Sequence, residues 1–537
     1  MKSFGECIKN LISKIGGPAR AAFIASLAAG LLTHMSVMVS DLPNHDGLGS
    51  LYFDQNMITS GRWFLSAACG ISSYFALPWL IGVLALIYIA ISSLLTVQVL
   101  ELKSRISGAV VGALMAVFPA LASTFAYVFT MDGYMLGLLM GVAAVFVTKR
   151  FKFGWIPGAV LLALSLGCYQ AYLPVVMLLC MIDAIMTATD RPSKDSFKGI
   201  LRYLYMGVIG GGLYFLILQI MLKIQGKTLG TYQLAGTGAA GADAAASAAQ
   251  GADAASKAGG ITGILGKVLS MYRDFAVFSL KSRVLSPNAF TWIALICIAV
   301  GAAVSFVIII IKKKLYKSPL LYIIAAAFVI CVPFASNVIM LISSDLTYHA
   351  LMRYQWVMIP VFYVTMMDRF GGKVMSWIIA IAGAVLVLVY SVTDNIGYSN
   401  LQKKYERTYA YCVRLLDRIE QTEGYYQGIP VAMIGVVSTD QYPKADLTEG
   451  VTDNLIGLSG DYLLYKNLDY QLFIKNYLGA DLNMISGDEI TKIYNSEEYI
   501  LMDSFPAENS VKLVDGVIYV KTENIDHELR QALETGK

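Results

Sequence analysis

The sequence predicts an all-α protein that crosses a membrane many times and carries a small α/β domain in its C-terminal part. Of its 537 residues, 57% are hydrophobic and only 15% are charged. The mean hydropathy of +0.61 is too high for a fold surrounded by water. Apolar runs follow one another from residue 20 to 392, and the chain then turns polar. The net charge of +4 is small, and no residue pattern indicates nucleic-acid binding.

About eleven apolar runs are long enough to cross a bilayer, because a spanning helix needs about 17–25 residues. The first run has no small-residue cleavage site, so we interpret it as a span and not as a signal peptide. The fifth and sixth form one nearly unbroken stretch that turns at Gly167–Leu173, and a buried or broken helix there would change the parity of the count. The runs lie near 20–40, 75–98, 106–124, 131–148, 154–169, 171–189, 203–222, 288–311, 319–342, 354–367 and 374–392.

The basic residues of the short loops predict the orientation. They precede the first span and then follow every second one, so eleven spans place them all on one side, which the positive-inside rule makes the cytoplasm. The N-terminus is then cytoplasmic, and loops 40–74, 223–287 and 343–353 face outward, as does the chain after about 393. The basic residues are Lys9, Lys14, Arg20, Lys103, Arg105, Lys149, Arg150, Lys152, Arg191, Lys194, Lys198, Arg202, Lys312, Lys313, Lys314, Lys317, Arg369 and Lys373.

The chain is expected to divide into a membrane domain, 1–394, and an outer domain, 395–537. The polar tail has the size of a small domain. Two apolar runs, Val511–Val514 and Val517–Val520, flank Asp515-Gly516, which is a signal for a two-residue hairpin turn. The other expected elements are a buried strand at 430–437, a helical region at 452–479 and an earlier helix that packs through Tyr405, Tyr409, Cys412, Leu416 and Ile419.

Two parts of the long outer loop have a composition of their own. Residues 238–259 are rich in alanine and glycine and repeat GADAA, so they lack the large apolar side chains that build a core. We interpret them as a linker. Residues 271–283 are amphipathic and are expected to lie along the outer membrane interface.

The first outer loop, DLPNHDGLGSLYFDQNMITSGRW at 41–63, has an unusual density of ionisable groups. A carboxylate that faces a polar cavity can act as general base on an acceptor hydroxyl, and we select Asp46, then Asp54, for this role. Arg62 can hold a phosphate leaving group by bidentate hydrogen bonds. The alternatives are turn chemistry for the acids and contact with lipid headgroups for the arginine. Further residues of interest in the loop are Asp41, His45 and Trp63.

The last short outer loop, SSDLTYHALMRYQW at 343–356, repeats the theme. Arg353 departs from the positive-inside pattern at the mouth of a span, so we expect an anionic partner for it. That partner is a donor phosphate, a headgroup or Asp345. Candidates for contact with a sugar or an acceptor are Tyr348 and His349 in this loop, and Tyr169 and Gln170 at an outer turn; the last two could instead satisfy the backbone of that turn.

The sequence predicts neither a metal site nor a cofactor. Its four histidines are scattered, and no spacing typical of metal ligands appears around them. The seven cysteines include no CxxC pair and no pairing framework, so disulfides are not expected either.

The chain resembles the Gtr-type, Gtr II-like O-antigen glucosyltransferases of the GT-C superfamily. The resemblance rests on the acidic first outer loop ending in GRW at 61–63, the Tyr-Gln pair at 169–170, the Arg-Tyr pair at 353–354 and the polar outer tail. It covers roughly residues 15 to 400, and each motif is short, so their order and topology carry the match. The alanine-rich insertion has no counterpart in that pattern.

The resemblance implies an inverting transfer of a hexose, often glucose, from a polyprenyl-phosphate sugar to a cell-surface glycan or glycolipid. It implies an enzyme of the bacterial cell membrane, with Asp46 as catalytic base and Asp54 as second choice. A phosphate leaving group could be met by Arg62 and Arg353 without a metal. The other classes left open are a lipid-linked glycan flippase or polymerase, which would carry ionisable groups inside its spans, and a non-enzymatic surface or sensor protein centred on the tail.

Overall fold

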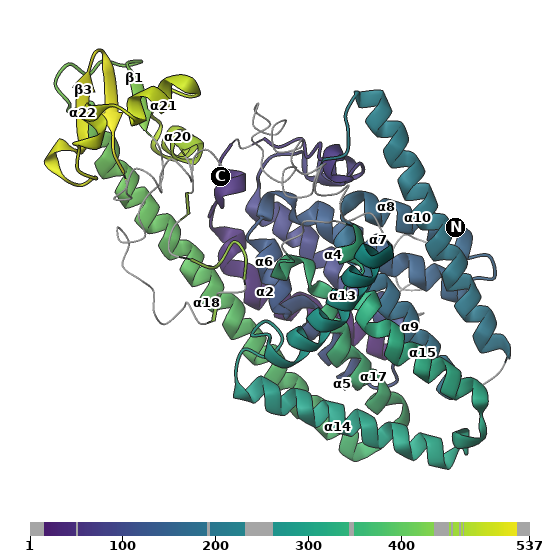
Figure 1. Cartoon of the computed structure of the whole chain (residues 1–537). Helices are drawn as coiled ribbons and strands as arrows, with labels where there is room; N and C mark the ends of the chain where they lie inside the picture. The colour runs from purple at the N-terminus through teal and green to yellow at the C-terminus, as the bar shows by residue number, and fades with distance from the viewer. Residues whose placement is uncertain are drawn as a thin grey trace, which may run out of the picture. The chain divides into compact units, whose positions relative to one another are not determined.

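The computed structural model describes residues 15–49, 52–190, 194–230, 261–342, 348–433, 451–452, 455–460, 463–464 and 467–522. The alanine-rich residues 238–259 and Asp345 lie outside this set. Contacts between Cα atoms divide the chain into two units (Figure 1). The helical unit comprises 1–41, 52–396 and 454–456, and the C-terminal unit comprises 42–51, 397–453 and 457–537.

Most of the predicted spans form helices. Within the described residues, eight helices are long and apolar enough to cross a membrane. A ninth candidate is the pair α5 (Arg105–Val117) and α6 (Pro119–Phe125), which bends by 43° where Pro119 follows Phe118. The eight are α2 (Gly17–Val39), α4 (Pro78–Val99), α7 (Met131–Arg150), α9 (Leu173–Asp190), α10 (Lys194–Gln225), α14 (Ala289–Lys312), α15 (Pro319–Ser336) and α18 (Lys373–Glu420).

The expected number of eleven spans is not confirmed, because two of the runs form shorter helices. Run 154–169 becomes α8 (Trp155–Cys168), of 14 residues, and run 354–367 becomes α17 (Met358–Phe370), of 13 residues. Each meets an irregular segment at one end, a 3-10 turn at Gln170–Tyr172 after α8 and another at Tyr354–Val357 before α17. The predicted outer turns therefore shorten these two helices.

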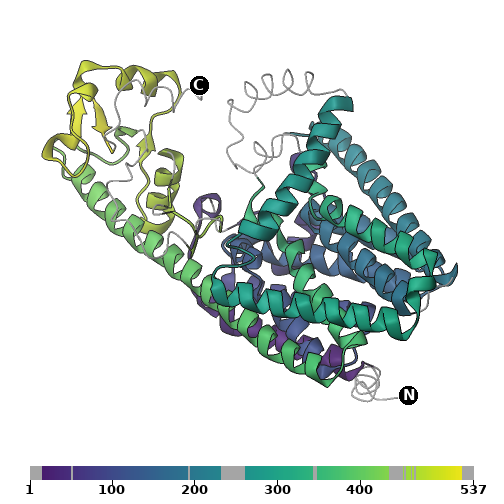
Figure 2. The ribbon, with the colours of Figure 1, turned by 60° about the horizontal axis from the view of Figure 1, so that its bottom comes forward.

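The helical unit is a closely packed bundle, whose helices lie side by side in both views (Figure 1, Figure 2). Helix α2 packs against α4 and α5, and α7 packs against α4 and α8. The α2–α5 contact uses a small-residue pair, Gly108 and Gly112, four residues apart on α5. A Cβ atom at Gly112 would lie 2.1 Å from the Ala22 carbonyl oxygen, so only glycine allows this approach.

One end of the helical unit gathers the basic loops in an ionic network. Lys149, at the end of α7, lies 2.8 Å from both Asp183 and Glu101. Arg369, at the end of α17, pairs with Asp190, which Lys313 also approaches at 3.1 Å. The loops predicted to share one side of the membrane therefore meet at one end of the bundle, here called the basic end.

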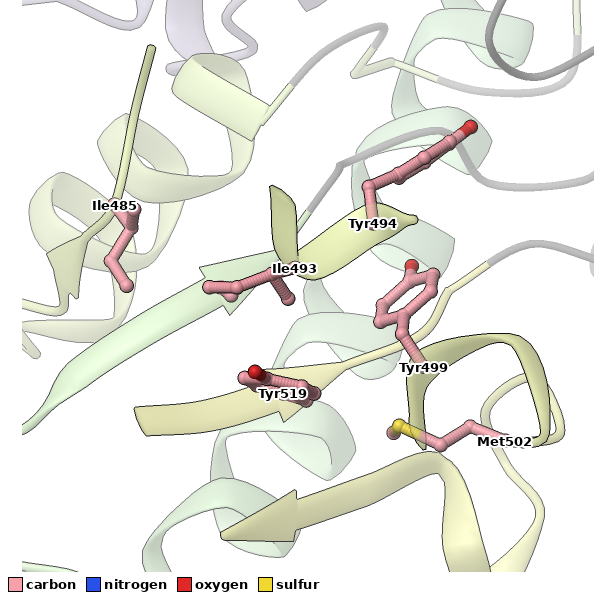
Figure 3. Packing of buried hydrophobic residues seen from close by; sticks show 7 residues of the cluster. Ile485, Ile493, Tyr494, Tyr499, Met502 and Tyr519 are labelled. Atoms are coloured by element: carbon pink, nitrogen blue, oxygen red, sulfur yellow. The ribbon is translucent and has the colours of Figure 1, made fainter. Parts of the chain in front are cut away.

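The C-terminal unit contains a four-stranded sheet in the order β2-β1-β4-β3. Strand β1 (Pro430–Met433) pairs in parallel with β2 (Asn483–Met484) and β4 (Val517–Val520), and β4 pairs antiparallel with β3 (Val511–Val514). Two short helices, α21 (Asp488–Tyr494) and α22 (Glu497–Ile500), pack on it. Figure 3 shows the core between them, with Ile485, Ile493, Tyr494, Tyr499, Met502 and Tyr519.

The predicted hairpin is confirmed, and Asp515 and Gly516 adopt the positive φ angles of 47° and 80° that its turn requires. The first four residues of the expected strand 430–437 form β1. The expected helix at 452–479 is wrong over 455–460, which form turns; the helical part is α20 (Asn467–Phe473) followed by a π-helical turn (Ile474–Leu478). On the preceding helix, Cys412, Leu416 and Ile419 are buried as expected, whereas Tyr409 is 40% exposed.

Candidate functional site

The Gly61–Trp63 turn of the loop at 41–63 is held by side chains from two other segments. Gln170 donates hydrogen bonds to the Ser60 carbonyl at 3.0 Å and to the Tyr214 hydroxyl of α10 at 2.9 Å. Tyr214 in turn donates to the Gly61 carbonyl at 3.2 Å. Gly61 has a φ of 76°, and a Cβ there would lie 2.5 Å from the Gln170 Nε2. Gln170 therefore supports the backbone of the Gly61–Trp63 turn, and not that of its own turn as the sequence analysis considered.

Arg62 lies in a cradle of tyrosines directly after this glycine. It is 7% exposed, and its Nη1 donates to the Tyr134 hydroxyl at 2.7 Å. Its guanidinium carbon lies 4.9 Å from the centre of the Tyr169 ring and 5.6 Å from that of Tyr134. These two rings stack at 4.5 Å. The faces of the tyrosine rings attract the cation, and the N–H groups of the guanidinium point outward in its own plane. The cradle therefore suits an arginine that also binds an anion.

Several buried polar atoms of the same segments have no hydrogen-bond partner. They are the Gln55 Oε1, the Ser60 Oγ and the Trp63 Nε1. Asp132, which is 1% exposed, accepts a hydrogen bond from the Gly133 amide at 2.8 Å and also interacts with the Ser72 and Cys69 side chains. Because an unsatisfied buried polar atom costs about 1–3 kcal/mol, the three unpartnered atoms are suited to receive water or a polar ligand.

Arg353 lies in a second cluster, and its anionic partner is Asp274. Its Nη1 and Nη2 donate to the two oxygens of Asp274 on α13 (Ile261–Lys281) at 2.7 and 2.8 Å. The guanidinium carbon also lies 3.8 Å from the Tyr348 ring centre and 4.4 Å from that of Phe278. Burial and the charge of Arg353 lower the pKa of His349, so this histidine is biased toward its neutral form.

A continuous series of aromatic rings leads from the Arg62 cluster into the core of the helical unit. Neighbouring ring centres in this series are 4.5–6.4 Å apart, and each ring is at most 7% exposed. Two of the hydroxyls bond to backbone, Tyr354 to the Met115 carbonyl at 2.6 Å and Tyr390 to the Leu285 carbonyl at 2.7 Å. The rings are, in order, Tyr134, Tyr169, Tyr172, Tyr354, Phe118 and Tyr390.

The acids of the loop at 41–63 have different surroundings. Asp54 is exposed and accepts a hydrogen bond from the Asn56 amide at 3.1 Å, which is turn chemistry. Asp41 is exposed at the end of the first stretch of the helical unit. Asp46 is half-buried in a 3-10 turn (His45–Gly47) that belongs to the C-terminal unit. The Asn44 side chain accepts hydrogen bonds from the Asp46 and Gly47 amides at 2.9 and 3.1 Å.

The structure thus brings Arg62, Tyr169 and Gln170 together, and separately Arg353, Tyr348 and His349. Sequence reasoning missed Tyr134 as a partner of Arg62 and Asp274 as the partner of Arg353. It noted both segments, but the 72 and 79 residues that separate the partners leave no local signal. Among the described residues, no group of three or more histidines, cysteines and acids could hold a metal ion.

The fold and this site define a membrane protein of many helices, with a buried arginine near the end of α7 opposite to the basic end. The family model described as glucosyl transferase GtrII matches residues 35–367, more than half of the chain, and the chain belongs to this family. The match contains the GRW turn, the Tyr-Gln pair and the Arg-Tyr pair. None of the curated proteins and none of the solved structures compared matches the chain. The protein is therefore a membrane glycosyltransferase.

Proposed function

We propose that the protein moves a hexose, glucose in the first instance, from a polyprenyl-phosphate sugar to a cell-surface glycan on the outer face of the membrane. Nucleotide sugars do not cross the bilayer, so a transferase working outside needs a donor that lipid carries. The proposal includes the GT-C type of mechanism, with inversion at the sugar carbon and no metal requirement. It places the protein in a bacterial cell membrane with its N-terminus in the cytoplasm.

The observation that supports it most is the tyrosine cradle of Arg62. A phosphate monoester leaving group gains negative charge as the sugar–oxygen bond breaks, and a buried guanidinium stabilises that charge far better than an exposed one. The Gln55 Oε1, which has no partner among the described residues, would accept from a hydroxyl group of the sugar. Tyr169, whose ring lies against the Arg62 guanidinium, is proposed to contact the sugar.

The base is assigned to Asp46, with Asp54 as second choice. The carboxylate takes the proton of an acceptor hydroxyl, and the oxygen attacks the anomeric carbon. The bond from that carbon to the phosphate oxygen breaks, and polyprenyl phosphate leaves. Asp46 sits in a fixed turn, whereas Asp54 lies in an exposed one, which supports this ranking.

Arg353 is proposed as a second phosphate contact, with Tyr348, His349 and Gln170 near the sugar or acceptor. Asp274 already occupies the Arg353 fork in the structure. A phosphate can bind to Arg353 only if Asp274 gives up at least one of its hydrogen bonds to the guanidinium. Arg353 is therefore a weaker candidate for phosphate binding than Arg62.

The test is transfer from radiolabelled polyprenyl-phosphate glucose in membranes that contain the full chain. We expect Asp46→Asn to lower the rate by about 100- to 10,000-fold, the usual contribution of a general base. The matched control is Asp488→Asn, which alters an exposed acid of the same unit. Retained transfer by Asp46→Asn removes this base and directs attention to Asp54. If the wild-type protein consumes no polyprenyl-phosphate sugar, the proposed donor is wrong.

A further inference from the structure

The turn that carries Asp46 is anchored inside the C-terminal unit. The Asn476 Nδ2 donates a hydrogen bond of 2.6 Å to the Leu48 carbonyl. Leu48 is 1% exposed and Asn44, which caps the turn, is 2% exposed. Both ends of this bond belong to the C-terminal unit. The position of Asp46 therefore depends on residues more than 400 positions away in the tail.

Asn476 stands on a π-helical turn that also carries an aromatic side chain. This turn, Ile474–Leu478, continues α20 and is a rare conformation that often marks functional sites. The next residue, Tyr477, stacks on Phe473 with ring centres 5.0 Å apart and planes at 20°. The anchor of the Asp46 turn and this ring therefore belong to the same helical turn of the C-terminal unit.

Tyr477 is part of a tyrosine cluster on the surface of the C-terminal unit. Its ring centre lies 5.9 Å from that of Tyr405, which lies 6.2 Å from that of Tyr409. Tyr409 is 40% exposed, and the other two are half-buried. Phe473 beneath them is fully buried and fixes the cluster to the core. Such a surface group of rings, each with a hydroxyl, combines flat apolar faces with hydrogen-bonding edges.

We propose that Tyr405, Tyr409 and Tyr477 form the binding surface for the acceptor glycan. The inference rests on the proposed function, in which Asp46 takes the proton of an acceptor hydroxyl. A base must lie within hydrogen-bond reach of that hydroxyl, so the acceptor has to pass over the surface around the Asp46 turn. A pyranose ring has an apolar face of C–H groups and a rim of hydroxyls, which matches the faces and edges of these tyrosines.

The experiment titrates the full-length protein, in detergent or nanodiscs, with envelope glycan isolated from cells that lack its gene. We expect Tyr409→Ala and Tyr405→Ala each to weaken glycan binding about tenfold, and Tyr409→Phe to weaken it less, because the ring remains. The matched control is Tyr426→Ala, which removes a 60% exposed tyrosine of the same unit and should change nothing. Tyr409 is exposed, so its replacement leaves the core intact.

The same variants are assayed with radiolabelled polyprenyl-phosphate glucose. The binding surface predicts a higher KM for the glycan with unchanged KM for the donor. Glycan binding equal to that of the wild type in Tyr409→Ala and Tyr405→Ala overturns the inference, and so does a wild-type protein that binds no glycan. Because the titration needs no donor, it reports on the tyrosines even if the donor proposal fails. Donor consumption by the wild type, with tyrosine variants unaffected, overturns the tyrosine surface alone.

Discussion

The charged side chains at the two ends of the helical unit have different kinds of partner. At the basic end, Lys149, Lys313 and Arg369 each meet a carboxylate, and the pairs tie together five helix ends. Near the opposite end of α7, Arg62 lies on the rings of Tyr134 and Tyr169. Ion pairs hold neighbouring elements together, whereas a buried guanidinium that lies on aromatic faces suits a site that receives an anion. We therefore interpret the basic end as structural and the surroundings of Arg62 as the candidate site.

Arg353 stands between these two cases. Like Arg62, it lies against aromatic rings, but like Arg369 it is paired with a carboxylate, that of Asp274. Its bidentate bond anchors α13, the helix that Phe275 and Phe278 also attach to Trp356 with ring centres 5.0 and 4.5 Å apart. The comparison therefore assigns it a structural role first and a phosphate contact second.

Of the changes that test this difference between the two ends, the largest effect is expected at the tyrosine cradle. Arg62→Gln should lower the rate of glucose transfer about 100-fold or more, because it removes a buried donor aimed at developing charge. Arg62→Lys keeps the positive charge but lacks the planar guanidinium with its several N–H donors, so it should recover only part of the rate. The measurement is the initial rate per folded molecule in membranes. Arg150→Gln, an exposed arginine beside the basic end, serves as control. An Arg62→Gln rate equal to that of the control would remove the arginine from the mechanism.

A smaller effect, on stability and not on turnover, is expected at the basic end. Asp183 accepts hydrogen bonds from Lys149 and from the Tyr203 hydroxyl, both at 2.8 Å. Asp183→Asn should lower the free energy of unfolding by about 1–3 kcal/mol, since charged hydrogen bonds are lost while Lys149 keeps Glu101. Thermal unfolding in detergent measures this change. A fall in turnover per folded molecule as large as that of Arg62→Gln would contradict the division between the two ends.

The smallest effect is a dependence of stability on pH through His349. Its pKa in the folded protein is lowered by burial and by Arg353. The unfolded chain, with a histidine pKa of about 6.5, then binds its proton first as the pH falls. The contribution of His349 to the free energy of unfolding is therefore fully present above a pH of about 6.5 and is lost as the pH falls below that value. Melting temperatures at pH 7.5 and 5.5 measure the decline, and His349→Gln should reduce it; an unchanged decline would show that other groups cause it.

The parts of the fold that depend on neighbours in the chain could be predicted from the sequence. Apolar runs predicted most of the long helices, and the Asp515-Gly516 turn predicted its hairpin, because a turn and a helix are decided by adjacent residues. The candidate site was predicted as a set of loops, and the structure places Arg62, Tyr169 and Gln170 at turns between helices, as expected.

The rest depends on partners far apart in the chain. The pairing of Arg353 with Asp274 and the anchoring of Leu48 by Asn476 join segments 79 and 428 residues apart. No spacing in a single sequence encodes such a contact. The runs at 154–169 and 354–367 do form helices, α8 and α17, but the 3-10 conformation of Gln170–Tyr172 and Tyr354–Val357 was not predicted.

The most direct test of the division between the two ends is the affinity of the purified protein for polyprenyl phosphate in nanodiscs. Arg62→Gln and Arg369→Gln each remove one buried arginine, from the cradle and from the basic end. We expect Arg62→Gln to weaken binding at least about tenfold, the size of one charged hydrogen bond, while folded Arg369→Gln binds like the wild type. Equal binding by Arg62→Gln and the wild type, or a greater loss in Arg369→Gln, would contradict this expectation.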